Sequence, residues 1–244
     1  MSWFALMDAS QERSGHRAPE ALAAVPAVPA VPARAAGRPA PVAGPTRSRM
    51  VANVVLSQAA WFAAVLGAAH GYPEAGSALV LAVIAWHLAV SARPGTEARL
   101  VLAVAAIGAV AETAVLQLGH VAYPDGQWLP WLPPHWLVAL WAVFAITLNV
   151  TLRWLRGRGW LAALLGGLAG PLAFASGVRL GGARFVDPVA ALAVIGAEWA
   201  LLLPLLVWLA AHLDGVVPVP RARSARSRDG VLPHVMHPGE RRDD

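Results

Sequence analysis

The chain has 244 residues, of which 57% are hydrophobic and only 14% are charged. Soluble domains carry roughly 25% charged residues, and the mean hydropathy of +0.55 also argues against a soluble enzyme. Cysteine is absent and every basic residue is arginine. Thiolate nucleophiles, iron–sulfur clusters and lysine Schiff bases are therefore excluded, and the composition predicts a membrane protein.

Residues 1–49 have the composition of an unfolded tail. They contain seven prolines, and an Ala-Val-Pro repeat ends at Pro32. A proline at every third position prevents a helix and favours a solvated chain, so we predict that this tail is disordered. Met50 opens the first apolar stretch, and one hypothesis is that translation begins there. Peptides from residues 1–49 in the native protein would exclude that hypothesis.

Six apolar stretches follow, each close to the ~20 residues that cross a bilayer. They cover residues 50–72, 75–92, 100–121, 135–152, 159–177 and 188–213. We therefore predict an all-α, polytopic transmembrane bundle of about six helices over residues 50–213. Residues 214–244 mix arginine, proline and acidic residues, and this tail is predicted to be disordered.

The arginines set the expected topology. They precede the first stretch, separate the second from the third and the fourth from the fifth, and follow the sixth. Cationic loops favour the cytoplasmic side, so we expect both termini to lie in the cytoplasm. Only Arg179 and Arg184 oppose this scheme. No nucleic-acid motif accompanies the arginines, so the expected partners are membrane lipid and other membrane proteins, not nucleic acid.

Two acidic residues, Glu112 and Glu198, interrupt the third and sixth stretches. Counted from the starts of those stretches, both are predicted to lie near the middle of the bilayer. An ionised carboxylate there costs at least ~3 kcal/mol, so each must be protonated, paired or beside water. The functional interpretation is a proton-titratable site in a cavity. The structural interpretation is a protonated acid that hydrogen-bonds a neighbouring helix.

Further polar residues are candidates for the same site. Thr113, Gln117 and His120 have the spacing of one helix face, and Asn149 lies in the fourth stretch. We group these residues with Glu112 and Glu198 as a candidate intramembrane polar site. Hydrogen bonds between helices are the alternative role for each.

Three histidines are predicted to lie at the outer boundary of the membrane, where they could form a metal site. His70, His120 and His135 lie there, with Glu74 and Asp125 in the adjoining loops. Zinc binds such ligands, but no pair has the short spacing of a metal motif. We therefore predict neither a metal nor a cofactor.

Small residues in the fifth stretch indicate close helix packing. Gly166 and Gly170 form a GxxxG pair, Pro171 is expected to kink the helix, and Gly177 follows one face further along. A broken helix that lines a substrate path is the alternative interpretation.

Several motifs together resemble the bacterial membrane-protein family of domain of unknown function 2878. The shared positions are Gln58, Trp61, Phe62, Gln117, Gly119, Tyr123, Pro124, Trp136, Leu140, Trp141, Phe144, Thr147, Asn149, Trp154, Gly167, Gly170, Pro171 and Gly177. The resemblance covers about residues 53–210. The family has Asp-Ser where this chain has Glu112 and Thr113. The resemblance implies a helical bundle in the bacterial inner membrane. It also associates the protein with lipid modification.

Three functions remain open at this point. The leading hypothesis is a non-enzymatic accessory component of envelope or lipid metabolism. A proton-coupled small-solute carrier that uses Glu112 is the second, and transport that survives Glu112→Gln unchanged would exclude it. The third is a lipid enzyme that uses Glu112, His120 and Asp125 near the outer face.

Overall fold

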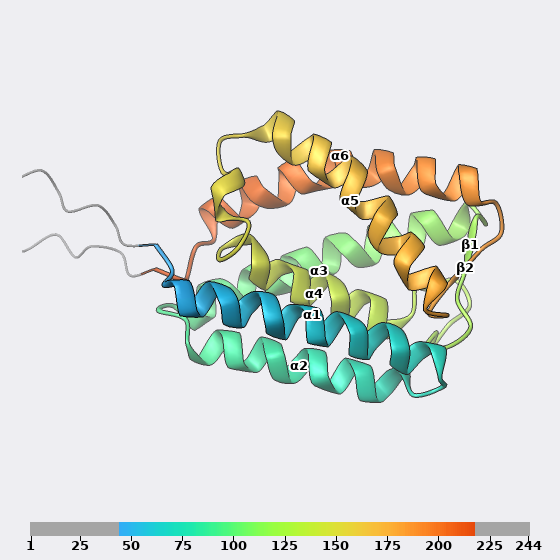
Figure 1. Ribbon diagram of the computed structural model, residues 1–244, viewed down its shortest axis with the longest axis horizontal. Helices are drawn as coiled ribbons and strands as arrows, with labels where there is room; N and C mark the ends of the chain where they lie inside the picture. The colour runs from blue at the N-terminus through green and yellow to red at the C-terminus, as the bar shows by residue number, and fades with distance from the viewer. Residues whose placement is uncertain (1–43, 218–244) are drawn as a thin grey trace, which may run out of the picture. The chain divides into compact units, whose positions relative to one another are not determined.

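The computed structural model describes residues 44–217, and it consists almost entirely of helices (Figure 1). The elements are α1 (Arg47–Ala69), α2 (Pro73–Ala89), α3 (Pro94–Gln117), β1 (Val121–Ala122), α4 (His135–Leu148), a 3₁₀ turn (Arg153–Leu155), α5 (Gly159–Arg179), β2 (Arg184–Phe185) and α6 (Pro188–His212). The predicted all-α bundle of six helices is therefore confirmed.

Four of the helices, α1, α3, α5 and α6, are long and apolar enough to cross a membrane. The helices α2 and α4 are apolar but have only 17 and 14 residues. At 1.5 Å per residue they measure about 26 Å and 21 Å, against a hydrocarbon core of about 30 Å. The fourth stretch was predicted to extend to residue 152. The helix ends earlier, at Leu148, because the Asn149 side chain hydrogen-bonds Glu97 and the Leu213 carbonyl at the end of the bundle.

The helices pack as three pairs: α1 with α2, α3 with α4, and α5 with α6. Figure 1 shows the α3–α4 pair between the other two. The helix α4 also packs against α1 and α2, whereas α5 packs mainly against α6. A gap is thus left between α1 and α5 on one side of the bundle.

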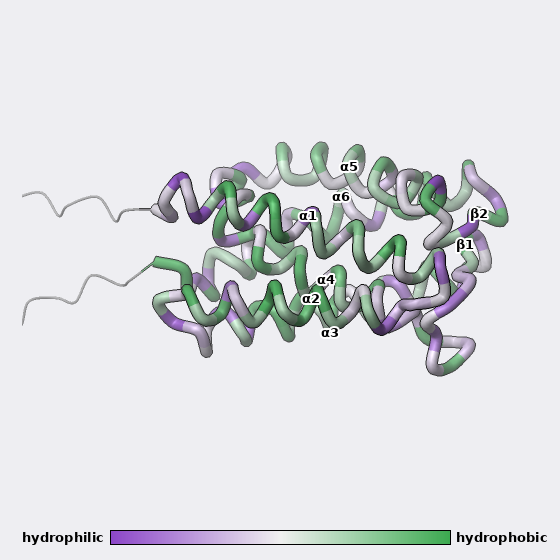
Figure 2. Tube along the Cα trace, turned by 60° about the horizontal axis from the view of Figure 1, so that its bottom comes forward, coloured by the Kyte–Doolittle hydropathy of each residue, from purple (hydrophilic) through white to green (hydrophobic). Residues whose placement is uncertain are grey.

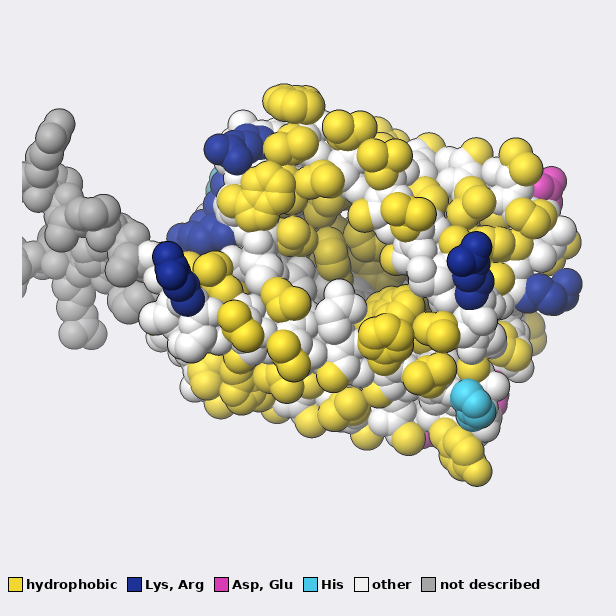
Figure 3. All heavy atoms as spheres, in the orientation of Figure 1, with side chains coloured by type: hydrophobic (Ala, Val, Ile, Leu, Met, Phe, Trp, Pro, Cys, Tyr) yellow, Lys and Arg dark blue, Asp and Glu magenta, His cyan; other side chains and the backbone are white. Residues whose placement is uncertain are grey.

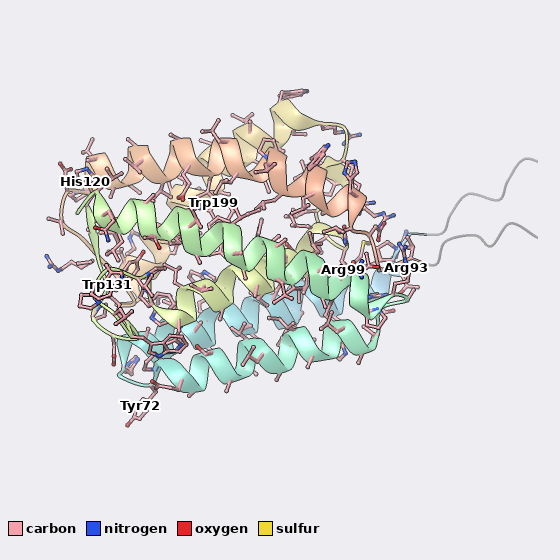
Figure 4. The ribbon with its side chains drawn as sticks, turned by 180° about the vertical axis from the view of Figure 1, so that it is seen from behind. Tyr72, Arg93, Arg99, His120, Trp131 and Trp199 are labelled. Carbon is pink, nitrogen blue, oxygen red and sulfur yellow. The ribbon has the colours of Figure 1, made fainter. Side chains whose placement is uncertain are left out.

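The two ends of the bundle differ in their residues. The two ends of the described chain lie together (Figure 1), beside Arg93 and Arg99 (Figure 4). We call this the arginine-rich end. At the opposite end β1 pairs antiparallel with β2, Val121 opposite Phe185, and joins the α3–α4 loop to the α5–α6 loop. We call this the β end.

The outer surface of the helices is apolar, and hydrophilic residues gather toward the two ends (Figure 2). Leu81, Leu102, Val110 and Leu201 are each more than 60% exposed. Such a surface would be unstable in water but is suited to lipid chains. At the β end Trp128 is also exposed, as expected of tryptophan at a headgroup boundary.

The structure shows how the chain is held at the two ends of the bundle. The helix α1 begins at Arg47, because the Thr46 hydroxyl accepts the Arg49 backbone N–H and caps it. At the other end, Asp214–Val217 pack against the bundle instead of leaving it. The rest of the predicted tails, residues 1–43 and 218–244, lies outside the described residues.

Candidate functional site

A cavity of about 550 Å³ lies between α1, α4, α5 and α6. Its walls are mostly apolar and aromatic, and they include Trp61, Phe144, Leu155, Phe174 and Leu203. Figure 3 shows the hollow on the face of the bundle that carries α1 and α5. Its volume lies within the roughly 300–1,000 Å³ that is typical of small-molecule sites.

The cavity continues sideways into a second hollow of about 570 Å³ between α1 and α5. Gln58, Trp61 and Ala173 line both spaces. The second hollow also carries Ser176 and Arg179 on α5. The two hollows thus adjoin each other on the side of the bundle where α1 and α5 face one another.

Two stacked indoles form one wall of the cavity. The rings of Trp141 on α4 and Trp199 on α6 lie 4.8 Å apart with an interplanar angle of 22°. Phe144 meets Trp199 edge-on at 5.1 Å. Figure 4 shows Trp199 midway along the bundle. Aromatic pairs of this geometry contribute about 0.5–1.5 kcal/mol beyond their buried area, so the wall is rigid.

Glycines on the neighbouring helices make room for these rings. A Cβ on Gly108 would lie 2.1 Å from Trp141 Cγ, and one on Gly170 would lie 2.5 Å from Trp199 Cγ. A Cβ on Gly166 would lie 2.2 Å from the Trp199 carbonyl oxygen. Gly166 and Gly170 thus lie where α5 packs closely against Trp199 of α6.

Gly177 and Pro171, which were predicted to share this packing role, have different surroundings. Gly177 is buried, but nothing lies within 4 Å of the position of a Cβ, because it faces the cavity. The helix α5 runs unbroken from Gly159 to Arg179 through Pro171, and the Pro171 ring faces Gly196 of α6.

Glu112 supplies the cavity with its acidic group. The side chain is 0% exposed, and its Oε1 accepts a hydrogen bond from Trp141 Nε1 at 3.0 Å. The helix α3 ends at Gln117, so Glu112 lies five residues before its end. It is thus about 8 Å from the β end of α3.

Three polar atoms of the cavity walls have no hydrogen-bond partner among the described residues. They are Glu112 Oε2, the Tyr123 hydroxyl and Trp199 Nε1, and all three are buried. The Tyr123 hydroxyl lies beside the Glu112 carboxylate, and burial together with the nearby acidic groups raises the pKa of Tyr123 well above its ordinary value. The phenol therefore keeps its proton. Two of the three, the Tyr123 hydroxyl and the Glu112 carboxyl group, are close enough to interact with each other.

Glu198 lies near Glu112 but does not line the cavity. Both of its carboxylate oxygens are buried without a partner among residues 44–217. The two acids, each predicted to lie near the middle of the bilayer, are thus neighbours, and of the two only Glu112 is among the residues around the cavity.

The structure does not bring the other predicted site residues to Glu112. Thr113 donates to the Ala109 carbonyl of its own helix at 2.6 Å, and exposed Gln117 donates to Trp131 O at 3.2 Å. His120 follows the end of α3, and its carbonyl accepts from Val186 N–H. None of the three lines the cavity. Thr113 points elsewhere because one step along a helix turns a side chain by 100°.

Asn149 belongs to a second polar cluster, at the arginine-rich end. It donates to Glu97 Oε1 at 2.7 Å, and Glu97 also accepts from His87 Nε2 and from Gly215 N–H, at 2.8 Å and 2.7 Å. Glu97, His87 and Asn149 are at most 1% exposed. We call these four residues the Glu97 cluster.

Sequence reasoning missed Glu97 and His87. Glu97 was placed in a loop before residue 100, but Pro94 starts α3 and puts Glu97 in the first helical turn. Proline followed by an acidic residue three positions later is a signal for a helix start, and it could have placed Glu97 correctly.

Beside this cluster, Asp214 forms ion pairs that hold the segment after α6 against the bundle. Its Oδ2 lies 2.6 Å from Arg153 NH1 and 3.0 Å from Arg156 NH1. Burial alone would raise its pKa, but the hydrogen bonds and charges of Arg156 and Arg153 hold the pKa of Asp214 below its ordinary value. Residues 214–217 are thus tied to the bundle at neutral pH.

No three side chains with metal-binding groups come together anywhere in residues 44–217. His70 Nδ1 donates to Leu66 O, and His135 Nδ1 shares a hydrogen bond with the Ser77 hydroxyl. Asp125 accepts from Gly126 N–H. The hydrogen bonds of Glu112 and Asp125, two of the residues considered for a lipid enzyme, go to Trp141 and Gly126 and not to each other.

Comparison with known proteins gives one family. The model described as a protein of unknown function, DUF2878, matches residues 50–205. No curated protein matches, and no solved structure matches.

Proposed function

The chain belongs to the DUF2878 family of proteins of unknown function, and from this premise we propose that it is a lipid-binding accessory component of envelope lipid metabolism in the bacterial inner membrane. The observation that carries the proposal is the apolar cavity that opens sideways between α1 and α5. A lipid chain could enter it from the bilayer without passing through water.

The residues around the cavity support binding rather than chemistry. Its polar groups are one carboxyl group, hydroxyl and indole donors and an amide, set in aromatic and aliphatic walls. Sites that orient a ligand have this composition. Catalysis by a nucleophile needs that residue within hydrogen-bond reach of a base, and no such pair lines the cavity among the described residues.

The arginines support the proposed orientation. Arg49 donates to Ser91 and to the Val216 carbonyl, and Arg153 and Arg156 pair with Asp214. These three arginines come from two separate segments, α1 and the connection between α4 and α5, and gather at the end where the described chain begins and ends. Cationic ends favour the cytoplasm, so we propose that both termini are cytoplasmic.

A proton-coupled carrier is the second candidate. The unpartnered Oε2 of Glu112 in a laterally open cavity favours it, because a carboxyl group of this kind could exchange a proton for a cationic solute.

We predict that filling the cavity removes bound lipid. Gly177 lines the cavity, and nothing lies within 4 Å of the position of a Cβ there, so in Gly177→Phe the side chain should enter the cavity and reduce its volume while the fold persists. The full chain, extracted in mild detergent, should retain lipid in native mass spectra, and the variant should lose most of it.

The matched control is Leu168→Phe on the same helix, where the side chain is 59% exposed and lies outside the cavity. It should retain lipid as the unmodified chain does. Equal retention in the Gly177 and Leu168 variants would contradict the proposal.

A further inference from the structure

A basic side chain lies on the outer hollow between α1 and α5. Arg179, in the last turn of α5, lines this hollow together with Trp61 and Phe62 of α1. No acidic side chain in the described part of the chain lies within ion-pair distance of its guanidinium. Figure 3 shows basic side chains beside the hollow toward the β end.

The proposed topology does not account for this arginine. Arg179 and Arg184 lie at the β end, which the other arginines place on the side away from the cytoplasm. Arg184 is exposed on β2 and lines neither hollow, whereas Arg179 belongs to the outer hollow. Arg179 is thus the cation that an anionic ligand of this hollow would meet.

The charge of the outer hollow is complementary to a phosphate group. Apart from Arg179, the side chains that line it are apolar, aromatic or uncharged. The Ser176 hydroxyl donates to the Leu172 carbonyl of its own helix at 2.8 Å, so the guanidinium is the strongest free donor on this wall. A guanidinium binds a phosphate through two parallel N–H donors.

A row of small residues on α5 leads from this arginine along the inner cavity. Ala169, Ala173 and Gly177 follow at intervals of four, so they share one helix face, and all three line the cavity. The row spans about 12 Å of helix, close to the ~15 Å depth of one leaflet. Because Arg179 follows at the β end of this row, an acyl chain along it would have its polar head beside Arg179.

The two hollows offer space for two acyl chains. They measure about 550 Å³ and 570 Å³, and Gln58, Trp61 and Ala173 line both. On α1 the Trp61 ring meets the Phe62 ring edge-on, with centroids 5.0 Å apart. A lipid with two chains on one head could place one chain in each hollow. A fatty acid also has an anionic head, but its single chain would leave one apolar hollow empty.

The position of the acid favours the same placement of the head. Glu112 lines the inner cavity and not the outer hollow, whereas Arg179 lines the outer hollow and not the inner cavity. A phosphate buried beside Glu112 would have a like charge near it and no cation to pair with, which is costly. The head therefore belongs in the outer hollow, and only a chain fits the inner cavity.

On the basis of the proposed function, we infer that the ligand is a glycerophospholipid of the leaflet at the β end. Its phosphate lies against Arg179, one acyl chain follows the row from Ala169 to Gly177 in the inner cavity, and the other chain occupies the outer hollow. Arg179 selects the phosphate, and the apolar walls bind the chains whatever the head.

The test compares this lipid with three competitors that each lack one part of it. Binding of tritiated dipalmitoyl phosphatidylglycerol to the full chain is measured in neutral detergent, and specific binding is the part that Gly177→Phe abolishes. Dipalmitoylglycerol lacks the phosphate and should bind about tenfold more weakly, because hydrogen bonds to charged groups are the stronger ones. Palmitic acid, with one chain, should also compete more weakly, and glycerol phosphate, with none, should not compete.

Variants of two arginines locate the phosphate. Arg179→Gln should reduce phospholipid binding about tenfold, to the level of dipalmitoylglycerol, and leave dipalmitoylglycerol unchanged. Arg179→Lys keeps the charge without the paired donors and should restore part of the loss. Arg184→Gln is the matched control, since it removes an exposed arginine of the same end that lines neither hollow. It should bind every probe as the unmodified chain does.

The contrary outcomes separate the two proposals. Equal binding of phospholipid and dipalmitoylglycerol, or equal losses in Arg179→Gln and Arg184→Gln, would overturn the phosphate site while lipid binding stands. Tighter binding of palmitic acid, or competition by glycerol phosphate, would overturn the two-chain ligand in the same way. If no lipid shows binding that Gly177→Phe abolishes, the proposed function is overturned as well.

Discussion

Gly108→Ala is expected to destabilise the bundle by at least about 3 kcal/mol, at the upper end of the range for overpacked cores. The new Cβ would lie 2.1 Å from Trp141 Cγ, a distance that real side chains do not adopt. Trp141 cannot move away easily, because its ring is stacked on Trp199 and its N–H is bonded to Glu112. Thermal unfolding of the purified protein in detergent measures the loss.

Gly95→Ala is the matched control on the same helix. Nothing lies within 4 Å of a Cβ at that position, and replacing a helical glycine by alanine gains up to about 1 kcal/mol. The double variant Gly108→Ala with Trp141→Leu should lose less stability than the sum of its single variants, because the ring that clashes is gone. Equal melting temperatures for the Gly108 and Gly95 variants would contradict the packing.

Glu97→Ala should have an effect of similar size at the other end of the bundle. The carboxylate accepts hydrogen bonds from His87, Asn149 and Gly215, all buried. Removing it strands three donors, and each stranded donor costs about 1–3 kcal/mol. We therefore expect a loss of several kcal/mol, together with faster hydrogen exchange at the Gly215 amide as residues 214–217 separate from the bundle.

Two variants make this prediction specific. Glu74→Ala removes an acidic residue from the first turn of α2 whose side chain is 79% exposed, and it should change neither stability nor exchange. Glu97→Gln keeps one acceptor oxygen and should lose less than Glu97→Ala. Unchanged exchange at Gly215 in Glu97→Ala would show that the cluster does not hold the chain.

Much of the fold could be predicted from hydropathy alone. In a membrane, a long apolar stretch pairs all of its backbone hydrogen-bonding groups when it forms a helix. The apolar stretches between arginine-containing turns therefore predicted six helices, and six are found in the described residues. The helix ends were less certain because apolar residues continue past them. The helix α4 stops at Leu148, since Asn149 is drawn to Glu97, a contact between residues far apart in the chain.

The candidate site could be predicted only in part. Glu112 stood out because an acidic residue within an apolar stretch is costly. Its partners could not be found in the same way, because Trp141 and Trp199 are unremarkable in apolar helices and acquire their role only where Gly108 and Gly170 let them stack. Thr113 and Gln117 were grouped with Glu112 by spacing along the helix, but the fold turns them toward other neighbours.

The absence of natural cysteine permits a direct test of the central claim, that the cavity opens to the bilayer between α1 and α5. A single cysteine at Ala173, on the wall shared by both hollows, is labelled with a small fluorophore in liposomes that contain lipids with brominated chains. The account predicts quenching as strong as that of the same label at exposed Leu168. Protection equal to that at Ala162, which is 0% exposed, would contradict it.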